Sequence, residues 1–334
     1  MAWARRISIG AVAISLASAA GGCGGGPPPA AEPADAPLPV ERPAGAVFPI
    51  GGMPEGLVFD PASRLLFAGL REPARLAAVD PASGRVVHVQ PLPSPPRHLA
   101  LAPSGDVLVP AEDANELIRV SPSGGRKATV MVGEHPHDAT SAAGREFVSD
   151  EFGDSVSVVQ GDRVIDTLEA PEQPGGIAAI GGRYVAVVAV GERVLEAFDA
   201  RTLASTGETD AGEGPTHAVS LGSTVLVADT EGNALLRYRI APRPEMIGRT
   251  ALPGVPYGLA FDPRRELVWV TLTARNRVEV LRVRGQRLEP IGGYPTVRQP
   301  NSVAVDPRTG TGFVAGRAAG SVERIPLPGD GGRR

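Results

Sequence analysis

The chain has little of what most catalytic and cross-linked folds require. Its 334 residues contain one cysteine, Cys23, so no internal disulfide can form and no Cys/His zinc cluster is present. A glycine-rich phosphate loop and a serine nucleophile elbow are also absent. Aromatic residues make up 4%, the formal net charge is -4, and no basic stripe carries interleaved aromatics, so nucleic acid is not expected as a partner.

Helix signals are scarce as well, and the chain shows a repeat in their place. A proline, one variable residue and then a small residue or histidine introduce a short apolar strand seven times, with spacings of 42, 40, 38, 41, 41 and 44 residues. The prolines are Pro54, Pro96, Pro136, Pro174, Pro215, Pro256 and Pro300. A fixed period of about 40 to 45 residues fits one four-stranded β-propeller blade. The sequence therefore predicts an all-β fold, a seven-bladed β-propeller over residues 45–328.

The last repeat is short of one strand. In the first unit four strands are expected, at 56–60, 64–68, 75–79 and 85–89. After Pro300 only three such stretches remain, at 302–305, 312–315 and 321–325. Residues 45–50 resemble the fourth strands of other units, so we expect this N-terminal strand to complete the last blade and remove an open sheet edge.

The positions that follow each proline lie closest to the axis of such a ring. Proline lacks an N–H and presets φ, which suits the first residue of a strand. Two residues later come Gly56, His98, Asp138, Gly176, His217, Gly258 and Ser302. Crowding of the innermost strands favours glycine there. The next residue is apolar in every unit, and we expect this set to pack between blades: Leu57, Leu99, Ala139, Ile177, Ala218, Leu259 and Val303.

The residues before the propeller have the pattern of an exported protein. Arg5 and Arg6 precede an apolar stretch too short to span a bilayer, so residues 1–22 are predicted to be an export signal peptide. The motif that ends at Cys23 resembles a bacterial lipobox, which implies a lipid on Cys23; cleavage of an ordinary signal after residue 19 is the alternative. Residues 23–44 are rich in Pro, Gly and Ala and are expected to be a tether, and 329–334 a disordered tail.

Two stretches, 66–87 and 227–236, resemble the YVTN-type β-propeller repeat. In that repeat an apolar strand leads through a turn containing Asn or Asp to a strand that ends near Asp. Asn115, Asp154, Asn233 and Asn276 occupy the turn position, although the namesake tetrapeptide is nowhere intact. The resemblance implies a propeller, and it implies no single activity, because such repeats occur in binding proteins, surface proteins and sugar lactonases.

Ligands of propellers usually bind around the axis, and several polar residues are expected on that face. The candidate ligand-binding residues are His98, His137, Asp138, His217, Glu112, Asp150 and Asp229. Imidazoles that converge with carboxylates hold divalent metals or share protons, so a divalent metal ion on His98, His137 and His217 is one open possibility. The other is that these histidines hydrogen-bond the backbones of neighbouring blades and have a structural role.

Two functions are therefore compatible with the sequence. The first is a non-enzymatic binding or scaffold protein, exported and anchored to the bacterial cell envelope through Cys23, with an unknown protein or small molecule as its ligand. The second is a propeller enzyme, a lactonase or a protein similar to streptogramin lyases, with a histidine and carboxylate metal site. No residue is assigned a catalytic role.

Overall fold

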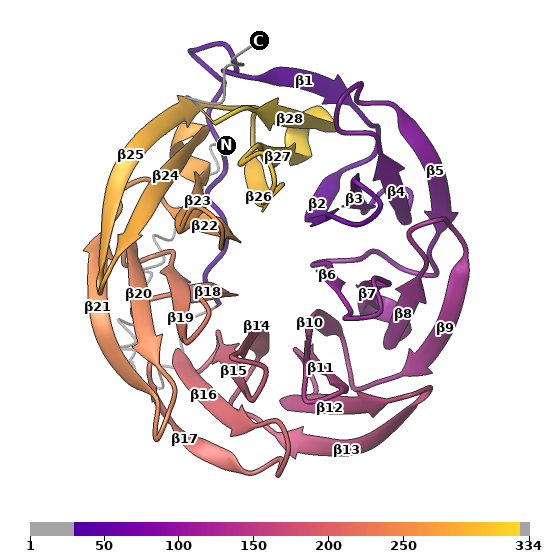
Figure 1. Cartoon of the computed structure of the whole chain (residues 1–334), viewed down its shortest axis with the longest axis vertical. Helices are drawn as coiled ribbons and strands as arrows, with labels where there is room; N and C mark the ends of the chain where they lie inside the picture. The colour runs from indigo at the N-terminus through magenta and orange to yellow at the C-terminus, as the bar shows by residue number, and fades with distance from the viewer. Residues whose placement is uncertain (1–29, 328–334) are drawn as a thin grey trace, which may run out of the picture.

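Seven four-stranded antiparallel sheets surround a central axis in the computed structural model, which describes residues 30–327 (Figure 1). The first four sheets are, from the axis outward, β2 (Pro54–Asp60), β3 (Leu65–Leu70), β4 (Arg75–Val79) and β5 (Val86–Pro91); β6 (Ala100–Leu101), β7 (Val107–Ala111), β8 (Glu116–Val120) and β9 (Arg126–Met131); β10 (Pro136–Ala142), β11 (Arg145–Asp150), β12 (Ser155–Gln160) and β13 (Arg163–Glu169); β14 (Pro174–Ile180), β15 (Tyr184–Ala189), β16 (Val194–Asp199) and β17 (Ser205–Asp210).

The other three sheets are β18 (Pro215–Ser220), β19 (Thr224–Asp229), β20 (Ala234–Arg239) and β21 (Glu245–Ala251); β22 (Pro256–Asp262), β23 (Leu267–Leu272), β24 (Arg277–Arg284) and β25 (Arg287–Pro295); β26 (Pro300–Val305), β27 (Gly312–Gly316), β28 (Ser321–Ile325) and β1 (Ala46–Pro49). The helical elements of the described residues are the short 3-10 turns η1 (Glu112–Ala114), η2 (Thr273–Arg275) and η3 (Arg317–Ala319). The predicted seven-bladed, all-β propeller is confirmed.

The ring closes through both ends of the chain, as predicted. Strand β1 pairs antiparallel with β28 and places Val47 opposite Glu323 (Figure 1). The last blade thus takes three strands from the C-terminal part and its outermost strand from the N-terminal part. The expected signal peptide, Cys23 and the tail 329–334 lie outside the described residues.

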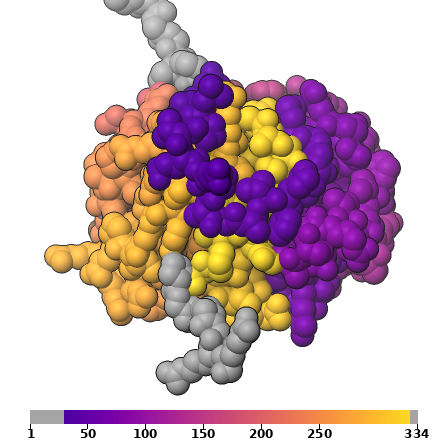
Figure 2. Space-filling view, turned by 90° about the horizontal axis from the view of Figure 1, so that it is seen from above, coloured from indigo at the N-terminus to yellow at the C-terminus, as the bar shows by residue number. Residues whose placement is uncertain are grey.

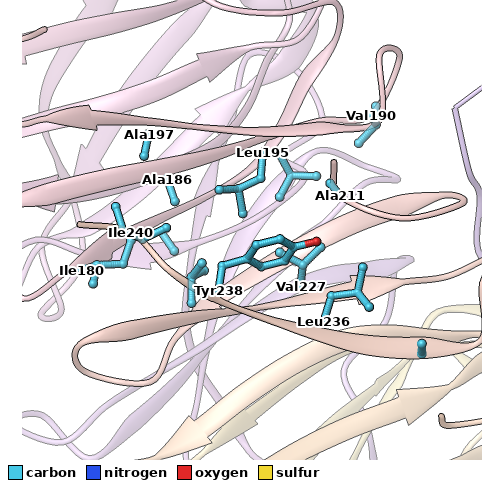
Figure 3. Close-up of a cluster of buried hydrophobic side chains, with 14 residues drawn as sticks. Ile180, Ala186, Val190, Leu195, Ala197, Ala211, Val227, Leu236, Tyr238 and Ile240 are labelled. Atoms are coloured by element: carbon cyan, nitrogen blue, oxygen red, sulfur yellow. The ribbon is translucent and has the colours of Figure 1, made fainter. Parts of the chain in front are cut away.

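Hydrophobic packing is concentrated between the blades. Seven buried clusters occur, one at each junction between neighbouring sheets. The junction of the fourth and fifth blades packs Leu195 and Val227 around Tyr238, which is fully buried (Figure 3). The Tyr238 hydroxyl donates a hydrogen bond to the backbone oxygen of Asp210 at 2.9 Å, so its burial leaves that group satisfied. Because the ring has no single core, each blade depends on its two neighbours.

The second strands of most blades are almost continuously buried, as in β19 and β23. A strand enclosed by two neighbouring blades needs no alternation of polar and apolar residues. Across residues 30–327, no helix has the length and apolar character needed to cross a membrane.

Candidate functional site

The site lies where each innermost strand begins, and a local irregularity shapes it. In six blades the pairing between the first two strands shifts register directly after the opening proline. In the first blade Pro54 pairs with Leu70 and Leu57 with Ala68, so Glu55 and Gly56 both oppose one residue. Such a bulge redirects side chains that regular alternation would separate.

The first residues after the prolines form one layer around the axis, and in six of the seven blades this residue lies at the bulge. We call this set the axial layer: Glu55, Arg97, His137, Gly175, Thr216, Tyr257 and Asn301. All except Arg97 are buried. The Asn301 amide donates to Glu55 Oε1 at 2.9 Å, and the Tyr257 ring contacts the ring of His217 with centroids 4.3 Å apart. Polar groups from all around the ring therefore meet at its centre.

The second residue after each proline must be small wherever it faces the backbone of the next blade. A Cβ added at Gly56 would lie 2.6 Å from the Arg97 backbone oxygen, and one at Gly258 would lie 2.7 Å from that of Asn301. The predicted crowding of the innermost strands explains these glycines. Histidines occupy the same position in two other blades, at His98 and His217.

The three predicted histidines lie together. The Nε2 atoms of His98 and His217 are 2.9 Å apart and share a hydrogen bond, and the ring centroids of His98 and His137 are 4.9 Å apart. Burial, followed by the nearby positive groups, lowers the pKa of His98 and of His137 well below the usual value. Burial, with a smaller effect of Arg97, lowers the pKa of His217 to about 3. All three imidazoles are therefore neutral at pH 7.

Arg97 determines how His137 is protonated. Its Nε donates to His137 Nε2 at 3.3 Å, so the ring proton of His137 is on Nδ1. That Nδ1 and the Nδ1 of His217 are buried, and neither has a hydrogen-bond partner among the described residues. Two buried imidazole nitrogens are thus free to bond a ligand that enters the axial layer.

Of the predicted carboxylates, Glu112 lies beside this cluster. It is 1% exposed, pairs with Arg71 at 2.7 Å and lies 3.8 Å from Arg97 Nε. Asp150 and Asp229 instead accept hydrogen bonds from nearby residues of the chain and hold the local structure of their blades. Asp150 Oδ2 accepts from the hydroxyls of Ser155 and Ser157. Asp229 Oδ1 accepts from the backbone N–H groups of three residues, Glu213, Gly214 and Gly232.

Asp138 lies in the central channel together with His98 and His217. This cavity of about 260 Å³ is bounded by His98, His217 and Asp138 and has walls of small and apolar side chains. The Asp138 carboxylate accepts hydrogen bonds from Ala139 N and Ile177 N, and burial nevertheless raises its pKa to about 7. The apolar residues three positions after each proline line this channel and also join the clusters between blades, where they were predicted.

Residues 30–44, the described part of the expected tether, lie on the propeller (Figure 2). Figure 2 shows this N-terminal stretch in indigo across the orange and yellow surface of the last blades. Ala31 and Ala36 are 8% and 3% exposed. Ala30, Ala31 and Glu32 close a cavity of about 20 Å³ whose other walls include Arg97, His137 and Tyr257. The reason is that backbone polar groups of this segment find side-chain partners on the sixth and seventh blades.

A divalent metal fits this arrangement poorly. No group of three or more His, Cys, Asp or Glu side chains within residues 30–327 has the geometry to hold a metal ion. The His98–His217 hydrogen bond occupies two of the expected ligand atoms, and the Arg97 guanidinium occupies the third, His137 Nε2. A cation bound there would have to displace both contacts and lie beside a positive charge.

Arg97, Tyr257, Glu55, Thr216 and Asn301 were not among the predicted site residues. The position after each proline looked variable, so no role was assigned to it. The sequence nevertheless contained a signal for this layer. The residue between the proline and the apolar strand is polar in six of the seven units.

No family model matches the chain, and no curated protein matches it. Among solved structures, streptogramin B lyase superposes with a TM-score of 0.72 at 14% identity, over 84% of this chain and 96% of that chain. Selenomethionine-substituted virginiamycin B lyase from Staphylococcus aureus gives 0.72 at 15% identity, over 84% and 98%. A chain of the mitotic checkpoint complex gives 0.74 at 12% identity, over 89% and 96%. These proteins differ in kind, so the likeness defines the β-propeller fold and leaves the activity open.

Proposed function

We propose that this chain is a binding protein of the bacterial cell envelope, exported, lipid-anchored through Cys23, and without catalytic activity of its own. Its ligand is held at the axial layer. The observation that carries this proposal is the pair of buried, unpartnered Nδ1 atoms of His137 and His217 beside Arg97. Leaving such groups unbonded costs about 1 to 3 kcal/mol each, which a polar ligand would offset.

The charges around the layer favour a ligand with both donors and acceptors. Arg97 faces Glu112, and Arg317 pairs with Glu55 at 2.8 Å, so positive and negative groups alternate around the opening. Glu151 lines the cavity of about 20 Å³ beside Arg97 and His137, and burial raises its pKa to about 6. A strongly charged ligand of either sign would meet repulsion from one of these groups.

A screen of thermal stability tests the binding proposal. The purified chain is mixed with amino acids, monosaccharides and short carboxylic acids, and Arg97→Ala and His217→Ala serve as axial variants. Arg64→Ala, an exposed turn residue, is the matched control. At least one compound should raise the melting temperature of the wild type and of Arg64→Ala, but not that of the axial variants. If every compound acts equally on all four proteins, the axial layer is not the binding site.

The alternative is an enzyme related in activity to the streptogramin lyases. It is favoured by the imidazoles of His217 and His137, which lie next to Tyr257 and Arg97 respectively. One of the similar structures is a catalytically inactive histidine-to-alanine variant of virginiamycin B lyase with quinupristin. Incubation of the present protein with quinupristin, followed by liquid chromatography, separates the two functions. We expect one unchanged peak; a new peak that is lost in His217→Ala would establish the enzyme.

Membrane anchoring has a separate test. Cys23→Ala should move the protein from the membrane fraction to the soluble envelope fraction, because one residue carries the lipid. A protein that stays with the membrane after this change would contradict lipidation at Cys23.

A further inference from the structure

We propose that the face beside the axial layer is a peptide-binding groove, filled in this structure by residues 30–37 of the same chain and able to take an extended segment of another polypeptide in their place. We call residues 30–37 the cover segment. The inference rests on the proposed binding function, because the groove borders the axial layer, and it adds the class of ligand.

The propeller recognises the backbone of the cover segment. Thr273 Oγ1 accepts from Ala34 N at 3.1 Å, and the Gln299 side chain accepts from Ala36 N at 2.9 Å and donates to Ala34 O at 2.8 Å. Arg298 Nε donates to Ala36 O at 3.1 Å. Asn276 Nδ2 donates to Pro37 O at 2.8 Å. These five hydrogen bonds all end on main-chain atoms of the cover segment.

The spacing of these contacts matches an extended peptide. The Gln299 amide bonds the carbonyl of one residue and the N–H of the residue two positions later, as a neighbouring strand does in a sheet. Main-chain contacts of this kind supply affinity, while pockets for side chains supply specificity. A sugar or a lipid headgroup has no such regular alternation of donors and acceptors.

The groove side chains are already fixed by the propeller itself. Thr273 Oγ1 donates to Val255 O, and the Gln299 amide also donates to Asn301 Oδ1. Asn276 Oδ1 accepts from the backbone N–H of Gln299. Because these bonds do not involve the cover segment, the groove should keep its shape when the segment leaves, which favours binding of a replacement.

The side chains of the cover segment indicate which peptides fit. Ala31 and Ala36 are buried, whereas Glu32 and Asp35 are exposed. The ligand therefore needs small residues at two positions five apart and tolerates acidic residues between them. Arg317 lines the adjoining cavity of about 470 Å³ together with Glu32 and Asp35, and because it already pairs with Glu55, acidic residues are accommodated there and are not required.

Displacing the cover segment within the full chain tests the proposal. Ala31→Arg/Ala36→Arg places two long side chains where no room exists, and Leu38→Arg, at a residue 75% exposed, is the control. The probe is a fluorescein-labelled synthetic peptide with the sequence of residues 30–39, followed by fluorescence anisotropy. We expect it to bind the double variant at least tenfold more tightly than the wild type or Leu38→Arg. Adding Gln299→Ala to the double variant should weaken binding at least tenfold.

The proposal is overturned if the peptide does not bind the double variant, if it binds all three proteins equally, or if Gln299→Ala has no effect. The peptide experiment and the compound screen can fail independently, so a failure of the groove can be told from a failure of the proposed function. A small compound that still binds through Arg97 while the peptide fails would leave the axial layer as a ligand site and remove only the groove. If the peptide binds and no compound binds in a way that depends on Arg97, the groove is kept and the axial layer is removed as a ligand site.

Discussion

Burial shifts the pKa values of His217 and Asp138 in opposite directions, because one side chain is a base and the other an acid. It lowers the pKa of His217 to about 3 and raises that of Asp138 to about 7. A histidine with a lowered pKa contributes stability above its unfolded pKa of about 6.5, and that stability is lost as the pH falls. A carboxyl with a raised pKa binds its proton in the folded state first, so its stability is lost as the pH rises.

Asp138 allows this second effect to be measured. Between about pH 4 and pH 7 the folded protein holds a proton on Asp138 that the unfolded chain has released, so the free energy of unfolding falls as the pH rises. In Asp138→Asn this contribution is absent. The stability of the variant relative to the wild type should therefore increase by about 1 kcal/mol per pH unit across this window. Urea denaturation at pH 4, 5.5 and 7 measures it.

Asp80→Asn is the control for this prediction. Backbone hydrogen bonds from Ala82 and Ser83 lower the pKa of Asp80, so it is ionised in the folded protein across this window, and the unfolded chain is ionised above about pH 5. Its substitution should change stability by the same amount at pH 5.5 and pH 7, and by only a few tenths of a kcal/mol less at pH 4. A flat difference for Asp138→Asn as well would show that its carboxyl is ionised in the folded protein.

Among the structural elements, strand β1 depends on one buried carboxylate. Glu323 on β28 is fully buried, and its Oε1 accepts from Gly45 N at 2.6 Å. Its Oε2 accepts from Val297 N at 3.1 Å and from the Thr296 hydroxyl. Burial raises its pKa. One side chain thus joins the start of β1 to β28 and to the loop between the sixth and seventh blades.

Glu323→Ala should lower the free energy of unfolding by about 2 to 4 kcal/mol, because three donors lose their acceptor. Glu323→Gln keeps one carbonyl oxygen and should cost less. Glu289→Ala, at an exposed position on β25, should be close to neutral. Guanidinium denaturation compares the three variants. Equal effects for Glu323→Ala and Glu289→Ala would mean that the closing strand does not depend on this carboxylate.

The elements could be predicted from sequence because each blade repeats a local pattern. The proline before each innermost strand and the apolar second strands recur at a fixed period, so the count of seven and the donation of residues 46–49 followed. The meeting of His98 and His217 also followed from their shared register, and His137 was expected beside them because it lies one position earlier in its unit. The roles of Arg97 and Tyr257 could not be predicted, because the geometry that brings the residue after proline to the axis leaves no mark in one unit alone.

The cover segment could not be predicted for a different reason. Its contacts are hydrogen bonds between main-chain atoms and side chains more than 200 positions away, such as Ala36 N to Gln299. A composition rich in Pro and Ala indicates only that a segment has no core of its own. Whether a folded neighbour offers it partners depends on the finished surface of the ring.

At the scale of the whole molecule, the N-terminal part contributes to stability in two separable steps. Residues 30–44 add main-chain hydrogen bonds and buried alanines on the last two blades. Residues 45–51 add β1 and the buried side chain of Ile50, which belongs to the cluster between the seventh and first blades. Only the second step closes the ring, because β1 covers the edge of β28.

Three chains that begin at residues 30, 45 and 52 separate these contributions. Starting at 45 rather than 30 should lower the free energy of unfolding by about 1 to 3 kcal/mol, the scale of a few partly exposed hydrogen bonds. Starting at 52 should cost several kcal/mol more, since β28 becomes an open edge and Ile50 leaves its cluster. It should also promote association through that edge. Urea denaturation with light scattering measures both effects. Equal stability of the chains that begin at 45 and 52 would show that β1 lies on the ring without holding it closed, and that packing between blades is sufficient by itself.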